Sequence, residues 1–190
     1  MAPRMTSPAA APPLTIRMAR LDGDDPEAYA RHIVDHMAES GRGGLPHFAL
    51  SRIWSRDEVR SGFVGRLAKG LDEPLWGRTW LLVDDRRVVG HLELRGGRLP
   101  AEMHRATLGM GILRAHTGQG HGRRLVEAAI RWARDDAGLS WIDLGVFASN
   151  APARRLYARM GFVEVGLRPD AFHLDAGPRI DDVQMALKLR

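Results

Sequence analysis

Three alternating glycines stand at the point in the chain where chemistry is most strongly indicated. They are Gly118, Gly120 and Gly122, and they lie between an apolar run, Thr107 to Leu113, and an amphipathic helical pattern that continues to about Asp135. Because glycine has no Cβ, the chain can turn tightly here and direct several backbone N–H groups at one anion, at the positive end of the helix dipole. The spacing therefore predicts a cradle for a ligand that carries a pyrophosphate.

Two familiar phosphate loops do not fit this glycine loop. The Walker loop ends in a lysine and a hydroxyl residue, whereas Gly122 is followed by Arg123 and Arg124. The dinucleotide-binding fingerprint has two residues between its second and third glycines, where this chain has only His121. Both ligand classes are therefore disfavoured, and a plain strand-to-helix turn remains open as an alternative.

The elements that must position the loop can be predicted from periodicity. Helical spacing predicts a helix from Asp25, a second from about Ser55 to Ala68 with a capping box, a third after the glycine loop, and a short fourth capped by Ser149 and Asn150. Alternating or apolar runs predict strands at Leu14–Met18, Thr79–Val83, Arg87–Leu94, Thr107–Leu113, Trp141–Phe147 and, last, from Val183 to Leu189.

These elements predict an α/β (α+β) fold. Early hairpins and a later loop-helix crossover imply a mixed, mostly antiparallel sheet of six to seven strands, flanked by about four helices, with one parallel step. The ligand should bind near that step. We expect the segments from Gly41 to Trp54 and from Leu167 to Asp181 to be loops that wall the site of a second substrate.

Length and composition limit the organisation of the chain. With 190 residues, 44% of them apolar, we expect a single domain over residues 14–190 after a disordered tail, residues 1–13. The absence of cysteine excludes disulfides, thiolate metal sites and cysteine nucleophiles, and it is compatible with a cytoplasmic location. No apolar run approaches the roughly 18 residues that span a bilayer, so we expect no membrane partner.

The formal net charge of +5 raises the possibility of a nucleic-acid partner. The arginines, however, alternate with acids, as in Asp84-Asp85-Arg86-Arg87, and aromatic residues are not interleaved with them. Mixed charge of this kind is typical of a solvated surface. We therefore expect no nucleic-acid partner.

One pair of histidines has the spacing of a metal site. His32 and His36 are four residues apart on a predicted helix, but Ile33 stands where the metalloprotease motif has its glutamate and no third ligand is recognisable. We expect these histidines to lie on a polar helix face, and we expect no metal.

Three segments together resemble a known superfamily. They are Leu108–Ile112 (LGMGI), the glycine loop, and Ser149–Phe162 (SNAPARRLYARMGF), and in this order and spacing they resemble the acetyl-CoA-dependent N-acetyltransferases, or GNAT superfamily. The resemblance covers the element order from Leu14 to Arg190. It implies acetyl-CoA as co-substrate, with its pyrophosphate in the glycine loop and its pantetheine arm inserted where the sheet splays.

The resemblance also implies residue roles. Tyr157, seven residues after Asn150, matches the usual general acid, a phenol with an ordinary pKa of about 10 that can protonate the departing thiolate. An interface aromatic with its hydroxyl at the surface is the alternative for Tyr157, and simple helix capping is the alternative for Asn150. The implied cofactor-binding residues are Met110, Ile112, Gly118, Gln119, Gly120, His121, Gly122, Arg123 and Asn150.

The chain departs from the superfamily pattern at three positions. Thr117 replaces the usual Arg or Gln before the loop, and Gly145 and Ala106 stand where relatives place a glutamate base. A base must then come from elsewhere, and His104 and Glu93, the latter with His91 on the same strand face, are the candidates. Direct attack through a water relay needs neither.

The sequence therefore predicts an N-acetyltransferase that moves an acetyl group from acetyl-CoA to a primary amine by direct attack in a ternary complex. A catalytically inactive acyl-CoA-binding module or sensor is the alternative, because the two glutamates are missing. The expected acceptor is a small-molecule or peptide amine, and a homodimer is left open. Acids near the C-terminus could attract a cationic amine: Asp170, Asp175, Asp181 and Asp182.

Overall fold

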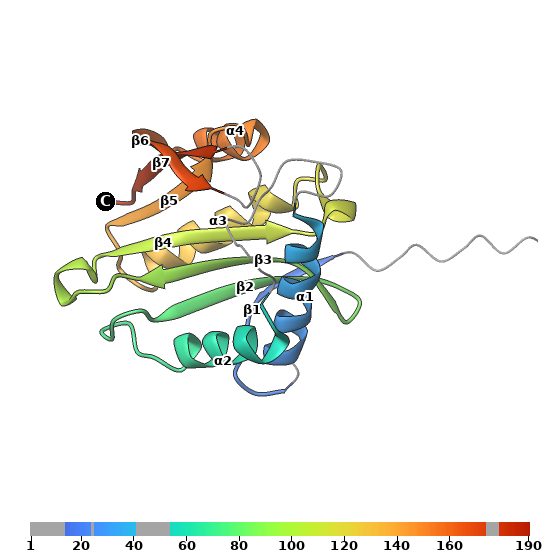
Figure 1. Cartoon of the computed structure of the whole chain (residues 1–190). Helices are drawn as coiled ribbons and strands as arrows, with labels where there is room; N and C mark the ends of the chain where they lie inside the picture. The colour runs from blue at the N-terminus through green and yellow to red at the C-terminus, as the bar shows by residue number, and fades with distance from the viewer. Residues whose placement is uncertain (1–13, 24, 41–53, 174–178) are drawn as a thin grey trace, which may run out of the picture.

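A computed structural model of the chain describes residues 14–23, 25–40, 54–173 and 179–190. The strands in this part form one sheet in the order β1-β2-β3-β4-β5-β7-β6 (Figure 1). They are β1 (Thr15–Met18), β2 (Gly77–Asp84), β3 (Arg87–Gly96), β4 (Arg105–Ile112), β5 (Trp141–Phe147), β6 (Val163–His173) and β7 (Arg179–Lys188). The α-helices are α1 (Asp25–Glu39), α2 (Arg56–Leu67), α3 (His121–Asp135) and α4 (Ala151–Arg159). The predicted fold class is confirmed, and the predicted tail, residues 1–13, lies outside the described residues.

Helices cover both faces of the sheet (Figure 1). On one face, Tyr29 of α1 and Phe63 of α2 stack with ring centroids 4.3 Å apart and pack against Leu81 of β2. On the other face, the apolar stripe of α3 packs against the remaining side of β2, β3 and β4. Strands β2 and β3 are consequently buried on both sides, which explains their nearly continuous apolar runs.

The capping box predicted for α2 is present. The Ser55 hydroxyl accepts a hydrogen bond from the Glu58 backbone N–H at 3.2 Å, and the Glu58 carboxylate accepts one from the Ser55 N–H at 2.8 Å. These two bonds satisfy N–H groups that the helix itself leaves open. They fix the start of α2, which forms one wall of the pocket described below.

The parallel step lies between β4 and β5. These strands pair over three positions only, Arg105↔Trp141, Ala106↔Ile142 and Thr107↔Asp143, while the other neighbouring strands of the sheet pair antiparallel. Beyond Thr107 and Asp143 the two strands separate, as the resemblance implied. The glycine loop and α3 form the crossover between them.

The predicted loop from Leu167 to Asp181 is wrong for most of its length. Strand β6 continues through it to His173 and β7 begins at Arg179, with residues 174–178 outside the described part. The pairing of β6 with β7 shifts register twice, and Asp170 has a positive φ of 48°. Two such irregularities, with Gly166 and Pro169 among them, break the alternation by which a strand is recognised.

No helix in the described ranges is long and apolar enough to cross a membrane.

The start of α1 is held by a buried carboxylate, and its replacement gives a first prediction. Asp25 accepts hydrogen bonds from both terminal nitrogens of Arg17 at 2.5 and 2.6 Å and from the Arg20 N–H at 2.8 Å. The bond from Arg17 lowers the pKa of Asp25. Asp25→Asn should therefore lower the free energy of unfolding at pH 7 by about 1 kcal/mol, a modest value because Arg17 is half exposed.

The pH dependence of this effect has a definite sign. Since the folded-state pKa is lowered, the stabilisation is complete above the ordinary value of about 4 and is lost as pH falls through the folded value. Urea titrations of both proteins should converge below about pH 3. Asp22→Asn, at an exposed position in the same loop, is the control. An undiminished difference at pH 2 would contradict the assigned ion pair.

Candidate functional site

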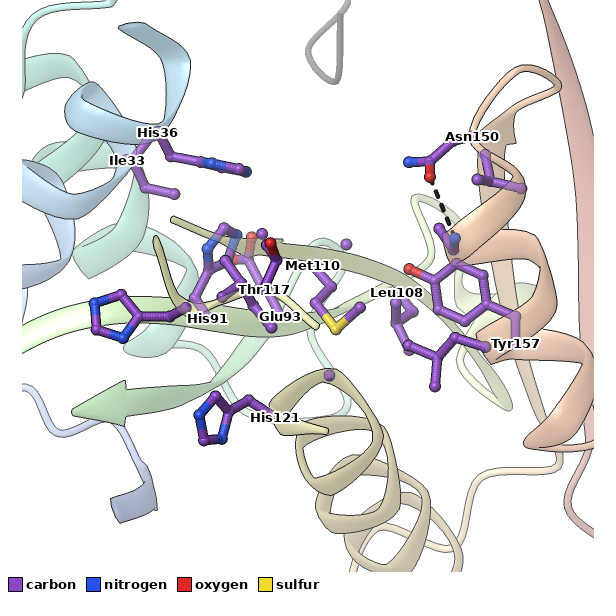
Figure 2. Close-up of a pocket in the computed structure, with 18 of the residues that line it drawn as sticks. Ile33, His36, His91, Glu93, Leu108, Met110, Thr117, His121, Asn150 and Tyr157 are labelled. Carbon is purple, nitrogen blue, oxygen red and sulfur yellow. Dashed lines mark hydrogen bonds between the residues drawn. The ribbon is translucent and has the colours of Figure 1, made fainter. Parts of the chain in front are cut away.

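A pocket of about 1630 Å³ opens where β4 and β5 separate. Its floor is the second half of β4, Leu108–Ile112, and residues 145–147 of β5 face it across the gap. Figure 2 shows His36, His91 and Glu93 on one side of the pocket, Asn150 and Tyr157 on the opposite side, and Leu108 and Met110 between them. The pocket therefore has one wall from α1, α2 and β3 and another from α4.

The three loop glycines serve two different purposes. Gly118 and Gly120 have φ of +73° and +81°, in the left-handed region that other residues rarely adopt. Gly122 lies in a tight space, because a Cβ there would lie 3.1 Å from Leu156, closer than an ordinary contact. Gly120 is the N-cap of α3 and provides no side chain to its first turn, so the first N–H groups of the helix are available to an anion.

Side chains around the loop are turned away from these N–H groups. Gln119 donates to the Ala115 carbonyl at 3.1 Å, and Arg123 donates to Glu127 at 2.7 Å. An anion would thus be held mainly by backbone. Of the predicted cofactor-binding residues, the pocket is lined by Met110, Ile112, Gly118, Gly120, His121, Gly122, Arg123 and Asn150, whereas Gln119 is exposed outside it.

Asn150 and Tyr157 come from the two ends of α4. The Asn150 side-chain oxygen accepts a hydrogen bond from the Ala153 N–H at 3.2 Å, so Asn150 caps the helix while it lines the pocket. Tyr157 is only 6% exposed, and Figure 2 shows its hydroxyl directed into the pocket. Burial raises the pKa of Tyr157 to about 12, so the phenol keeps its proton at any physiological pH.

The two predicted bases are placed very differently. Glu93 is 5% exposed and lines the pocket, but one carboxylate oxygen accepts from Arg66 at 2.6 Å and the other lies 3.6 Å from Arg95. Both oxygens are thus engaged by guanidinium groups. His104 is exposed in the turn before β4 and is not among the residues that line the pocket.

A carboxylate lies behind Gly145, where relatives place glutamate. A Cβ built on Gly145 would meet the Asp182 oxygens at 2.9 and 3.0 Å, and Gln184 donates to Asp182 at 2.5 Å. Asp182 is 4% exposed, and burial raises its pKa although Arg168 opposes the shift. The sequence suggested Asp182 only as one of four loop acids. Its burial depends on the β5–β7 pairing, for which no local signal exists.

The expectation that His32 and His36 form a polar helix face is wrong. They are 1% and 6% exposed, because α1 packs this face against β3, where His91 is also buried. His36 lies so close to Gly111 of β4 that a Cβ there would clash with its ring, which explains this glycine. In the described part of the chain, no group of histidines and carboxylates is arranged to hold a metal ion.

Comparison with known proteins places these features in context. Residues 47–162 match the family model described as Acetyltransferase (GNAT) family. The Bacillus subtilis protein described as uncharacterized N-acetyltransferase YycN is 23% identical over 158 residues, which cover 80% of this chain and 94% of that protein.

Solved structures of other proteins share the fold. Salmonella typhimurium yncA, solved with its cofactor acetyl-CoA, superposes with a TM-score of 0.78 at 22% identity, over 94% of this chain and 95% of that one. A spermidine N-acetyltransferase from Vibrio cholerae, solved with CoA and spermine, gives a TM-score of 0.72 at 20% identity, over 92% and 95% of the two chains.

Proposed function

The chain belongs to the GNAT family of acetyltransferases, and on this premise we propose that it transfers the acetyl group of acetyl-CoA to a primary amine by direct attack in a ternary complex. The observation that carries the proposal is that one pocket contains both the gap between β4 and β5 and the glycine loop at the start of α3. The separated strands β4 and β5 open at one end onto the N-terminus of α3, whose glycine loop suits a pyrophosphate.

The gap between β4 and β5 suits the extended arm of the co-substrate. Pairing stops at Thr107 and Asp143, so β4 offers the backbone groups of Leu108–Ile112 to whatever enters the gap. An extended chain with amide groups can satisfy them as a neighbouring strand would. Arg114 and Arg159 also line the pocket and supply positive charge for phosphates. The cofactor-bound yncA structure supports this assignment.

The acceptor should enter between the wall formed by α1, α2 and β3 and residues 145–147 of β5. There the amine nitrogen attacks the thioester carbon, the carbonyl oxygen takes up negative charge, and the carbon–sulfur bond then breaks. The hydroxyl of Tyr157, across the pocket, donates a hydrogen bond to the departing sulfur. Direct attack requires both substrates to be bound at once, and the volume of about 1630 Å³ is sufficient for that.

Asp182 should recognise the charge of the acceptor. It lies directly behind Gly145, which lines the pocket, and a buried carboxylate attracts a cationic amine strongly. The spermine-bound Vibrio cholerae structure supports a small cationic amine as one class of acceptor. We expect Asp182→Asn to raise KM for the amine about tenfold, roughly one charge-assisted hydrogen bond, with acetyl-CoA affinity unchanged. Asp143→Asn on β5 would not be a suitable control, because Asp143 is half-buried and pairs with Arg105. Asp136→Asn, at an exposed position, is the control.

The function itself can be tested with little background. The chain has no cysteine, so CoA is the only free thiol in a reaction of protein, acetyl-CoA and amine, and a thiol reagent follows it directly. Amine-dependent CoA release is the expected result. Saturable acetyl-CoA binding without release against a broad panel of primary amines would instead favour the acyl-CoA-binding module, and absence of binding would refute both functions.

A further inference from the structure

Two buried histidines connect the pocket to the outer side of α1. His91 of β3 lines the pocket, and its Nδ1 lies 2.9 Å from the Nε2 of His32 on α1. His91 is 7% exposed and His32 is 1% exposed. One nitrogen of each ring is therefore used in the mutual hydrogen bond. The other two, His91 Nε2 and His32 Nδ1, are the ends of the pair.

His32, at the outer end of the pair, borders a small hollow. His32 lines a second cavity of about 20 Å³, between α1 and the turn that joins β2 and β3. Its Nδ1 is buried and has no hydrogen-bond partner within the described part of the chain. A volume of roughly 10–15 Å³ is enough for one water molecule, and the salt bridge between Asp35 and Arg87, 3.1 Å, gives this hollow a polar wall.

The proposed reaction requires a route for a proton. A primary amine is charged at neutral pH and must lose a proton in order to attack. Ala106 and Gly145 carry no carboxylate of their own, and Glu93 is held by Arg66 and Arg95. Asp182, behind Gly145, is likewise engaged, because it accepts a hydrogen bond from Gln184 at 2.5 Å and lies 3.7 Å from Arg168. We propose, on the basis of the proposed function, that His91 and His32 form a proton relay from the acceptor amine to the hollow beside Asp35.

The transfer balances, and neither histidine becomes charged: the positive charge moves from the ammonium group to water in the hollow. The amine N–H bond breaks as an N–H bond forms at His91 Nε2. The proton on His91 Nδ1 moves to His32 Nε2, and the proton on His32 Nδ1 leaves for water in the hollow. Both rings end in the opposite neutral tautomer. After the product has left, the same steps in reverse take a proton from the hollow and release it from His91 Nε2 to water in the pocket, which restores the starting tautomers.

The electrostatics favour a relay over storage of the proton. Burial lowers the pKa of His32 to about 3, with help from Arg87, and lowers the pKa of His91 well below its ordinary value. Neither ring can therefore hold an extra proton for long, but each can pass one on. The groups that face the pair are Tyr29, His36 and Asp35 from α1, Arg66 from α2, Glu93 and Arg95 from β3, and Arg87 from the start of β3.

The decisive variant is His32→Leu, which breaks the relay one residue away from the pocket. We expect kcat at pH 7 to fall at least tenfold, with KM for the amine and the Kd of acetyl-CoA unchanged. The deficit should shrink to less than threefold by about pH 9.5, because amines then begin to lose their protons to solvent. His32→Gln, which keeps a hydrogen-bonding group but has no second ring nitrogen, should behave in the same way. His173→Leu, on exposed β6, is the control.

The outcomes separate the relay from its alternatives. An unchanged kcat in a folded His32→Leu protein, or a deficit of equal size at all pH values, would overturn the relay, since the latter indicates a structural defect. His91→Gln combined with His32→Leu should be little worse than His91→Gln alone, because the two residues act as a unit. If the wild type binds acetyl-CoA but acetylates no amine, the proposed function fails and the relay with it. An active wild type with an unaffected variant refutes the relay alone.

Discussion

Replacing Tyr157 by phenylalanine is expected to lower kcat about 10²-fold, the typical loss when one donor to a developing negative charge is removed. The Kd of acetyl-CoA should stay within about twofold, because the ring and its contact with Phe162 are retained, at a centroid distance of 5.7 Å. Stopped-flow or steady-state thiol release measures the first quantity and calorimetry the second. An unchanged kcat would remove Tyr157 from the mechanism.

The raised pKa of Tyr157 refines the role of its hydroxyl. A thiol has an ordinary pKa of about 8.5, so the phenol, at about 12, holds its proton more tightly than the departing sulfur can. Its contribution is then a hydrogen bond that strengthens as charge develops on sulfur. Because the hydroxyl is lost only as pH rises towards 12, no alkaline loss of activity below about pH 11 should come from this residue.

Gly120→Val is expected to weaken acetyl-CoA binding about 10²-fold. Gly120 has φ of +81°, a conformation that is a strong outlier for a β-branched residue, so the loop must rearrange and misdirect the N–H groups of α3. A Cβ at this position meets nothing within 4 Å, so the packing itself is not disturbed. Titration calorimetry measures the loss directly.

A matched glycine provides the control for Gly120→Val. Gly65, in the last turn of α2, has an ordinary helical conformation and equally open space around it. Gly65→Val should leave the Kd of acetyl-CoA unchanged. If both variants, or neither, lose affinity, then the left-handed turn is not what positions the phosphate donors.

Most of the fold could be predicted because the sequence patterns that specify these elements involve residues close together in the chain. Strand β5 was predicted with its observed bounds, and the Asn150 cap and the α2 capping box follow from side chains within three residues of one another. Strand β6 was missed because it depends on β7 for its hydrogen bonds, and its own sequence is interrupted by Gly166 and Pro169.

The candidate site was predictable only where a motif is contiguous. The glycine loop, Asn150 and Tyr157 lie in two short segments, and all but Gln119 of the predicted loop residues line the pocket. Asp182 and the pair of His32 and His91 come from segments far apart in sequence, and α1 must dock on β3 before the two rings meet. No spacing rule reaches across 59 residues.

The short pairing of β4 with β5 also divides the sheet into two parts that are only weakly joined. Four strands lie on one side of this pairing and three on the other. The two parts are joined by strand pairing at three residue positions and by the crossover helix α3. A bound ligand that bridges β4 and β5 would connect the two parts of the sheet. Binding should therefore make the whole sheet more rigid and raise the melting temperature of the protein by mass action. The amide protons of Leu108–Ile112 should then exchange with deuterium more slowly, so their exchange rate indicates whether substrate is bound between β4 and β5.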